Sequence, residues 1–202
     1  MINVQQIANL HREMVLRWHE QEIDFPFDAI LGIVCRQHSY NFLLWHEEDI
    51  ARSPDVGDAR IAQVKRSIDR YNQQRNDWIE KIDDWITEDL QQQGIQPQER
   101  AALNTETPGS AIDRLSILAL RIYHLEEQTQ RSDASVQHIQ SVANKLAICR
   151  LQHHDLSTSL SQLLDDISTG RKRHKTYRQF KMYNDPTLNP YLYQPQKRAA
   201  GA

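Results

Sequence analysis

The residues best able to do chemistry begin in NFLLWHEEDIAR, residues 41–52, which puts a histidine, three consecutive acids and an arginine into one apparent helix. At 100° per residue, one polar arc of this helix consists of Asn41, Trp45, Glu48 and Arg52, with His38 and Asp49 at its edges. His46 and Glu47 point elsewhere and are predicted to be surface or boundary groups. A solvated face gives the same pattern, but carboxylates beside an imidazole also form a candidate catalytic site.

A second polar arc follows the apolar stripe of the next helical segment, residues 58–92. Its members are Lys65, Asp69, Asn72, Asn76, Glu80 and Asp83. Asn and Asp are poor interior helix residues because their short side chains compete for backbone hydrogen bonds, so this row needs a compensating role. Two roles remain open: hydrogen bonding between helices, or a site for a hard cation built from facing helices.

If the polar arcs form a cation site, the sequence predicts an enzyme active site that holds Mg²⁺ or Mn²⁺. Its expected metal ligands are Glu48, Asp49, Asp69, Glu80 and Asp83. Water bound to the ion would be the nucleophile, and His38 or a free carboxylate such as Glu48 or Asp49 would be the general base. Asn41, Arg52, Lys65, Asn72 and Asn76 are then expected to contact the ligand.

A candidate phosphate site lies where NTETPGSAIDRLSILALRIYH, residues 104–124, enters a helix. The free amides and positive dipole end of a helix N-terminus favour an anion. The expected ligand-binding residues here are Thr107, Gly109, Ser110, Asp113, Arg114, Arg121 and His124, with Lys181 from the C-terminal tail. The same turn is also a good helix start without any ligand, because Ser110 and Asp113 fit a capping box.

These residues must be positioned by helices, because the sequence shows 3.6- and 3.5-residue periodicity with almost no alternation. Five main helices are predicted, over residues 3–20, 28–52, 58–92, 108–130 and 134–169. The fold class is therefore all-α: a single-domain helical bundle, residues 1–170, whose heptad stripes at 61–85 and 139–167 pack in one core. An extended basic C-terminal tail, residues 171–202, is predicted to pack on the bundle through its aromatic residues, with its last residues disordered.

Composition limits the partners. The formal charge is −3 over 202 residues, but residues 171–202 carry about +7 and residues 1–170 about −10. An acidic body makes nucleic acid an unlikely partner, and binding of nucleic acid by the basic tail is a third, less favoured hypothesis. No apolar run approaches the roughly 20 residues of a membrane span, and no secretory signal precedes the first helix, so a cytoplasmic location is expected.

Four stretches resemble a bacterial family of unknown function. They are LWHEEDIAR (44–52), IDRYNQQRNDWIEKID (68–83), NTETPGSAIDRLSILALRIYH (104–124) and RQFKMYNDPTLNPY (178–191). The resemblance implies a whole small protein whose tail belongs to the same set of motifs, and it implies no activity. Residues 80–83 also have the ExxD form found in the all-α nucleoside triphosphate pyrophosphohydrolases, but the ExxE half of that Mg²⁺ site is missing.

These sequence features support two alternative functions. The preferred function is that of a metal-dependent, hydrolase-type enzyme that acts on a phosphorylated or nucleotide-linked small molecule. The alternative is a non-catalytic helical binding protein, in which the polar arcs are saturated by one another and no metal binds. The sequence predicts neither the substrate nor the oligomeric state.

Overall fold

The computed structural model describes residues 2–193. Its five long helices are α1 (Val4–Glu20), α2 (Ala29–Arg52), α3 (Asp58–Gln92), α4 (Pro108–Thr129) and α5 (Val136–Ser168). The shorter elements are strands β1 (Ala102–Leu103) and β2 (Lys172–Arg173), the 3-10 helix η1 (Met182–Asn184) and helix α6 (Pro190–Tyr193). The all-α prediction is confirmed, and each long helix begins and ends within two residues of its predicted bounds. No helix among the described residues is long and apolar enough to cross a membrane.

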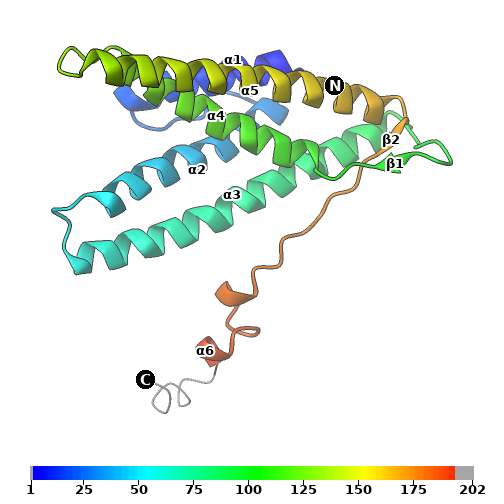
Figure 1. The fold of residues 1–202 in the computed structure, drawn as a ribbon. Helices are drawn as coiled ribbons and strands as arrows, with labels where there is room; N and C mark the ends of the chain where they lie inside the picture. Colours follow the sequence, from blue (N-terminus) through cyan, green and yellow to red (C-terminus); the bar gives the residue numbers. More distant parts are fainter. Residues whose placement is uncertain (1, 194–202) are drawn as a thin grey trace.

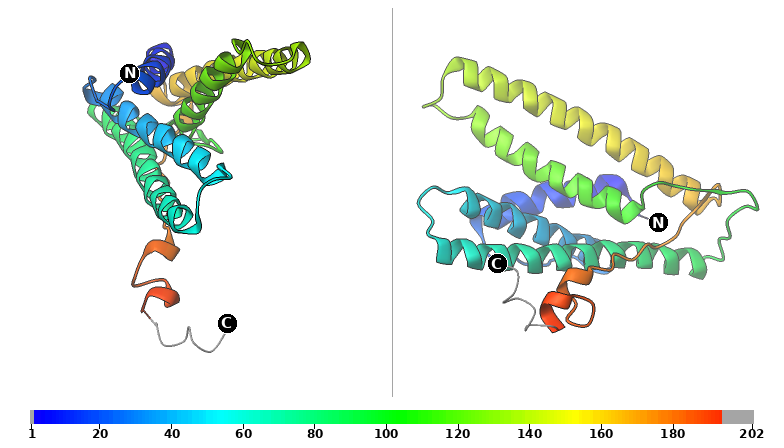
Figure 2. Two further views of the ribbon diagram at one scale, coloured as in Figure 1. Left: turned by 90° about the vertical axis from the view of Figure 1, so that its left-hand side faces the viewer. Right: turned by 60° about the horizontal axis from the view of Figure 1, so that its bottom comes forward.

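The helices form two antiparallel hairpins, α2–α3 and α4–α5, with α1 packed mainly against α4 and α2. Figures 1 and 2 show that the hairpins lie close together at one end and diverge toward the other. The main core contains Ile82 and Ile86 of α3 together with Leu160 and Leu164 of α5. At the diverging end, α2 and α3 bury a separate small cluster that includes Val64 and Ile68. The prediction that both heptad stripes pack in one core therefore holds only where the hairpins meet.

Polar groups cross the main core in a continuous chain. His38 is fully buried, with Nε2 3.1 Å from the carbonyl oxygen of His11 and Nδ1 2.6 Å from the Ser116 hydroxyl. The carbonyl can only accept, so Nε2 carries the proton and Nδ1 accepts from Ser116. Asn41 then donates to Ser116 Oγ at 2.9 Å and to Asp113 Oδ1 at 2.8 Å. These bonds tie α1, α2 and α4 together.

The tail runs back along α3. Strand β2 pairs in parallel with β1, and His174 Nε2 donates to the carbonyl oxygen of Asp83 at 2.9 Å. Arg178 bridges Glu80 and Asp84 at 2.8–3.1 Å. The predicted burial of the tail aromatics is wrong, because Tyr177, Phe180, Tyr191 and Tyr193 are 49–83% exposed. Ion pairs and main-chain hydrogen bonds hold residues 172–179 instead. The predicted disorder of the last residues lies outside the described range.

The buried His38 generates a prediction about acid stability. Burial lowers the pKa of His38 from its usual 6.5 to about 3, partly offset by its hydrogen bond to His11. Below pH 6.5 the unfolded chain protonates this histidine while the folded chain does not. The free energy of unfolding should therefore be unaffected by His38 above pH 6.5 and fall by about 1.4 kcal/mol per pH unit below it.

Urea denaturation between pH 7.5 and pH 5 measures this effect. His38→Gln, which cannot titrate, should show a shallower loss of stability on acidification than the wild type. His138→Gln is the matched control, because His138 is exposed on α5. If the wild type and His38→Gln lost stability equally steeply on acidification, the lowered pKa of His38 would be contradicted.

Candidate functional site

A polar groove runs between α2, α3, α4 and the tail. It consists of two adjoining cavities of about 450 and 480 Å³, both lined by Asn72 and Arg75 of α3. The predicted site residues of the first cavity are Asp69, Asn72, Asn76, Ser110, Asp113, Arg114 and Lys181. Those of the second cavity are Asn41, Glu48, Asp49, Arg52, Asn72 and Arg121. The structure thus brings most of the predicted ligand-binding residues to one groove.

Cations from three separate segments meet in the first cavity: Arg75 from α3, Arg114 from α4 and Lys181 from the tail. Burial lowers the pKa of Lys181, and the positive charge of Arg75 lowers it further. The Nε of Arg75 is buried without a hydrogen-bond partner, 3.9 Å from Asp113 Oδ1. Within residues 2–193, Arg114 and Arg121 make no hydrogen bond or ion pair. Like charges held together with donors to spare are what an anion-binding site requires.

Sequence reasoning missed Arg75. The sequence feature that could have identified it is its position, three residues after Asn72 and one before Asn76. This position places Arg75 beside the polar arc of α3. Its importance depends on Lys181, which is 106 positions later in the chain, and helical periodicity carries no information about that contact.

The five acids predicted to bind Mg²⁺ or Mn²⁺ do not converge. Glu48 pairs with Arg52 at 2.7 Å, Asp69 with Lys65 at 2.6 Å, and Glu80 accepts from Arg178 and from the Gln179 N–H. Asp49 is on the rim, with its side chain 61% exposed. Among the described residues, no three carboxylates bring their oxygens close enough to share an ion. Glu48, Asp69 and Glu80 each pair with a cation instead, so the five acids do not form the predicted ligand set.

Asp83 instead occupies the predicted phosphate position at the start of α4. Its Oδ1 accepts the Gly109 N–H at 2.8 Å, and Thr107 Oγ1 accepts the Ser110 N–H at 3.2 Å. Burial raises the pKa of Asp83, and hydrogen bonds from Thr107 and Gly109 partly offset that shift. The helix N-terminus is therefore satisfied by the protein's own carboxylate. Of this turn, only Ser110 lines the groove.

Asp113 forms the floor of the groove. It is buried, and its Oδ1 accepts from Gln37 at 2.6 Å and from Asn41 at 2.8 Å. Burial raises the pKa of this carboxyl, and the positive charge of Arg75 acts in the opposite direction. A carboxyl with a raised pKa beside cations is a group that can exchange a proton with a bound ligand.

Both histidines among the predicted site residues lie elsewhere. His38 has both ring nitrogens engaged in the core and does not line the groove. His124 turns away from the groove toward His19 and His46, with the three ring centroids 5.2–6.0 Å apart. The prediction that His46 is only a surface or boundary group missed this cluster, because its members come from α1, α2 and α4.

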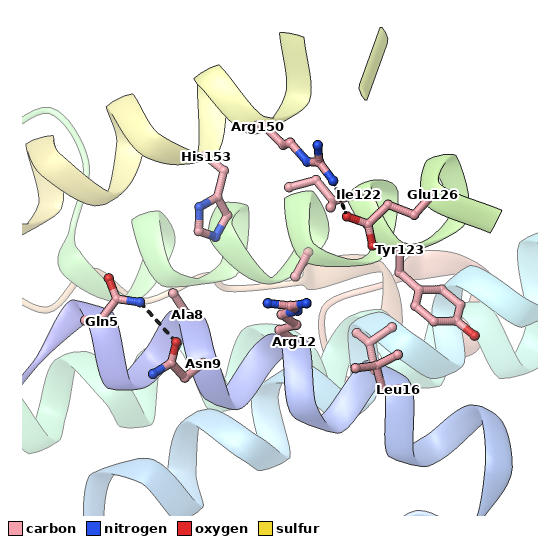
Figure 3. Close-up of a pocket in the computed structure, with 12 residues that line it drawn as sticks. Gln5, Ala8, Asn9, Arg12, Leu16, Ile122, Tyr123, Glu126, Arg150 and His153 are labelled. Atoms are coloured by element: carbon pink, nitrogen blue, oxygen red, sulfur yellow. Dashed lines mark hydrogen bonds and ion pairs between the residues drawn. The ribbon is translucent and has the colours of Figure 1, made fainter. Parts of the chain in front are cut away.

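A separate cavity of about 340 Å³ lies between α1, α4 and α5. Figure 3 shows Arg12 of α1 and His153 of α5 pointing into it, with the Arg150–Glu126 ion pair at its edge. None of the predicted site residues lines this cavity. It is therefore distinct from the polar groove.

A model of the family described as "Protein of unknown function (DUF4254)" matches residues 31–176, and the chain belongs to this family. The match confirms the resemblance to a family of unknown function, and it spans α2 to α5 with the groove residues they carry. A bacterial origin stays a prediction. No curated protein and no solved structure matches the chain.

The contact between Asp83 and Gly109 generates a prediction about stability. A Cβ at residue 109 would lie 2.6 Å from the Ile79 carbonyl oxygen and 2.9 Å from the Asp83 carboxylate. Gly109→Ser should therefore push α4 away from α3 and lower the free energy of unfolding by about 1–3 kcal/mol. Gly57→Ser is the matched control, because nothing lies within 4 Å of a Cβ there. Urea denaturation of both variants tests this, and equal stabilities would refute the close contact.

Proposed function

We propose that the protein binds a phosphorylated small molecule in the polar groove. The observation that carries this proposal is the convergence of Arg75, Arg114 and Lys181 on one cavity. Three acids also line this cavity, of which Asp69 is already paired with Lys65 and Asp113 has a pKa that burial raises. Glu106 is the third, so it offsets only part of the charge of the three cations. A dianionic phosphate would relieve the repulsion between the cations.

The chemistry of the lining fits such a ligand. Guanidinium groups on Arg75 and Arg114 can each donate two hydrogen bonds to phosphate oxygens, and Lys181 adds a compact charge. The Ser110 hydroxyl and the amides of Asn72 and Asn76 can bond the hydroxyls of a sugar or similar group. Cavities of about 450 and 480 Å³ suit a small molecule.

Hydrolysis of the bound phosphate compound is a second candidate function, favoured by Asp113. In this scheme the carboxylate takes a proton from water as the water oxygen attacks phosphorus and the bond to the leaving oxygen breaks. The proton then passes to the leaving oxygen. The predicted five-acid site for Mg²⁺ or Mn²⁺ does not fit the geometry, so no step is routed through those ions.

Calorimetric titration with inorganic phosphate, nucleotides and sugar phosphates tests the binding proposal. Arg75→Ala and Arg114→Ala should each weaken binding about 10- to 100-fold, because each removes a charge-assisted hydrogen bond. Arg66→Ala is the matched control, since Arg66 is exposed on α3 and outside the groove. Unchanged affinity in both groove variants, or binding of none of these compounds by the wild type, would overturn the proposal.

Phosphate release tests the second function separately. Asp113→Asn should retain ligand binding, since its Oδ1 can still accept from Gln37 and Asn41, but it should lose phosphate release. Binding by the wild type without any release of phosphate would remove hydrolysis and leave the binding function in place.

A further inference from the structure

Three histidines from three helices meet beside the groove. His19 comes from the end of α1, His46 from α2 and His124 from α4. Their ring centroids are 5.2, 5.2 and 6.0 Å apart, and one ring nitrogen of each lies within 4.8 Å of the other two. Imidazoles bound to one tetrahedral ion at about 2.0–2.1 Å have their nitrogens roughly 3.3 Å and their centroids roughly 5 Å apart. The rings are therefore already spaced almost as a shared ion requires.

The hydrogen bonds of two histidines fix which nitrogen is available. His19 Nδ1 lies 2.7 Å from the Val15 carbonyl oxygen, and His124 Nδ1 lies 2.7 Å from Glu127 Oε2. Both partners accept, so Nδ1 carries the proton and Nε2 keeps its lone pair. The Asp49 carboxylate lies 3.9 Å from His46 Nδ1 and favours the same tautomer there. Histidine metal ligands are typically oriented in this way, by a carbonyl or carboxylate on the other ring nitrogen.

The remaining nitrogens have no partner. Nε2 of His19, His46 and His124 are all buried from solvent and form no hydrogen bond. A proton on one of them could be shared with a second nitrogen but not with the third. Packing accounts for the ring planes, since Trp45 stacks on His124 and Tyr123 stacks on His19, but it leaves the three lone pairs unsatisfied. A cation among them would satisfy all three at once.

We propose that His19, His46 and His124 bind Zn²⁺ through their Nε2 atoms. Three neutral imidazoles suit zinc, whereas Mg²⁺ and Mn²⁺ prefer oxygen ligands. The site goes beyond the phosphate-binding function and does not depend on it. Three protein ligands leave a fourth coordination position, which water or an anionic group can fill.

The surroundings support this assignment. The His46 side chain is 39% exposed, so the cluster lies at the surface, where an ion can enter. Asp49 and Trp45, which contact His46 and His124, also line the polar groove. The proposed ion therefore lies next to the groove wall.

Metal titration of untagged, chelator-stripped protein at pH 7.5 tests the proposal. The wild type should bind one equivalent of Zn²⁺ and show a higher melting temperature, and Co²⁺ should give the visible absorption of a tetrahedral nitrogen-ligated ion. Mg²⁺ should do neither. His46→Ala should lose the bound equivalent and the Co²⁺ spectrum, whereas His138→Ala, an exposed histidine on α5, should keep both.

A milder variant protects the test against misfolding. Glu127→Gln leaves all three ligands in place, and by weakening the orientation of His124 it should lower zinc affinity about 10-fold or more. Arg114→Ala should bind Zn²⁺ normally while losing phosphate affinity, and His46→Ala should show the reverse, so the two proposals can fail independently. Absence of zinc uptake by folded wild type, or full uptake by both His46→Ala and His124→Ala, would overturn the zinc site.

Discussion

The buried hydrogen-bond chain from His38 through Ser116 and Asn41 to Asp113 is the constraint on which the arrangement depends. Polar groups in a core are costly unless they are paired, so the crossing of α2 and α4 must keep donors and acceptors in register. That crossing also aims Asp113 into the polar groove. The same contact that satisfies the core therefore builds the floor of the candidate site.

The divergence of the two helical hairpins gives the groove its room. Where α3 and α5 share a core, apolar side chains fill the space between them. Farther along, α3 packs on α2 alone, and polar residues line the opening toward α4. The tail then adds Lys181 from outside, because ion pairs along α3 hold its backbone near Arg75. A ligand in the groove would contact segments that are far apart in the chain.

The two proposed sites differ in chemistry although they adjoin. The groove offers guanidinium, ammonium and amide donors, which match a hard, negatively charged ligand. The histidine cluster offers only nitrogen lone pairs, which match a transition-metal ion. Trp45 and Asp49 belong to the boundary of both, because they contact the histidine cluster and also line the groove.

The sequence by itself determined the helices and their polar faces, because periodicity, caps and turns are local properties of the chain. It placed Asn72, Asn76, Thr107 and Arg114 among the ligand-binding residues, and these do lie at the groove or at the start of α4. Only the tertiary structure decided which faces meet. It paired Asp83 with Gly109 and buried His38 in the core. It also placed Arg75 in the groove and brought three histidines together from separate helices. A spacing of 100° per residue fixes the side of a helix on which a residue lies, but the neighbour it meets there depends on how distant segments pack.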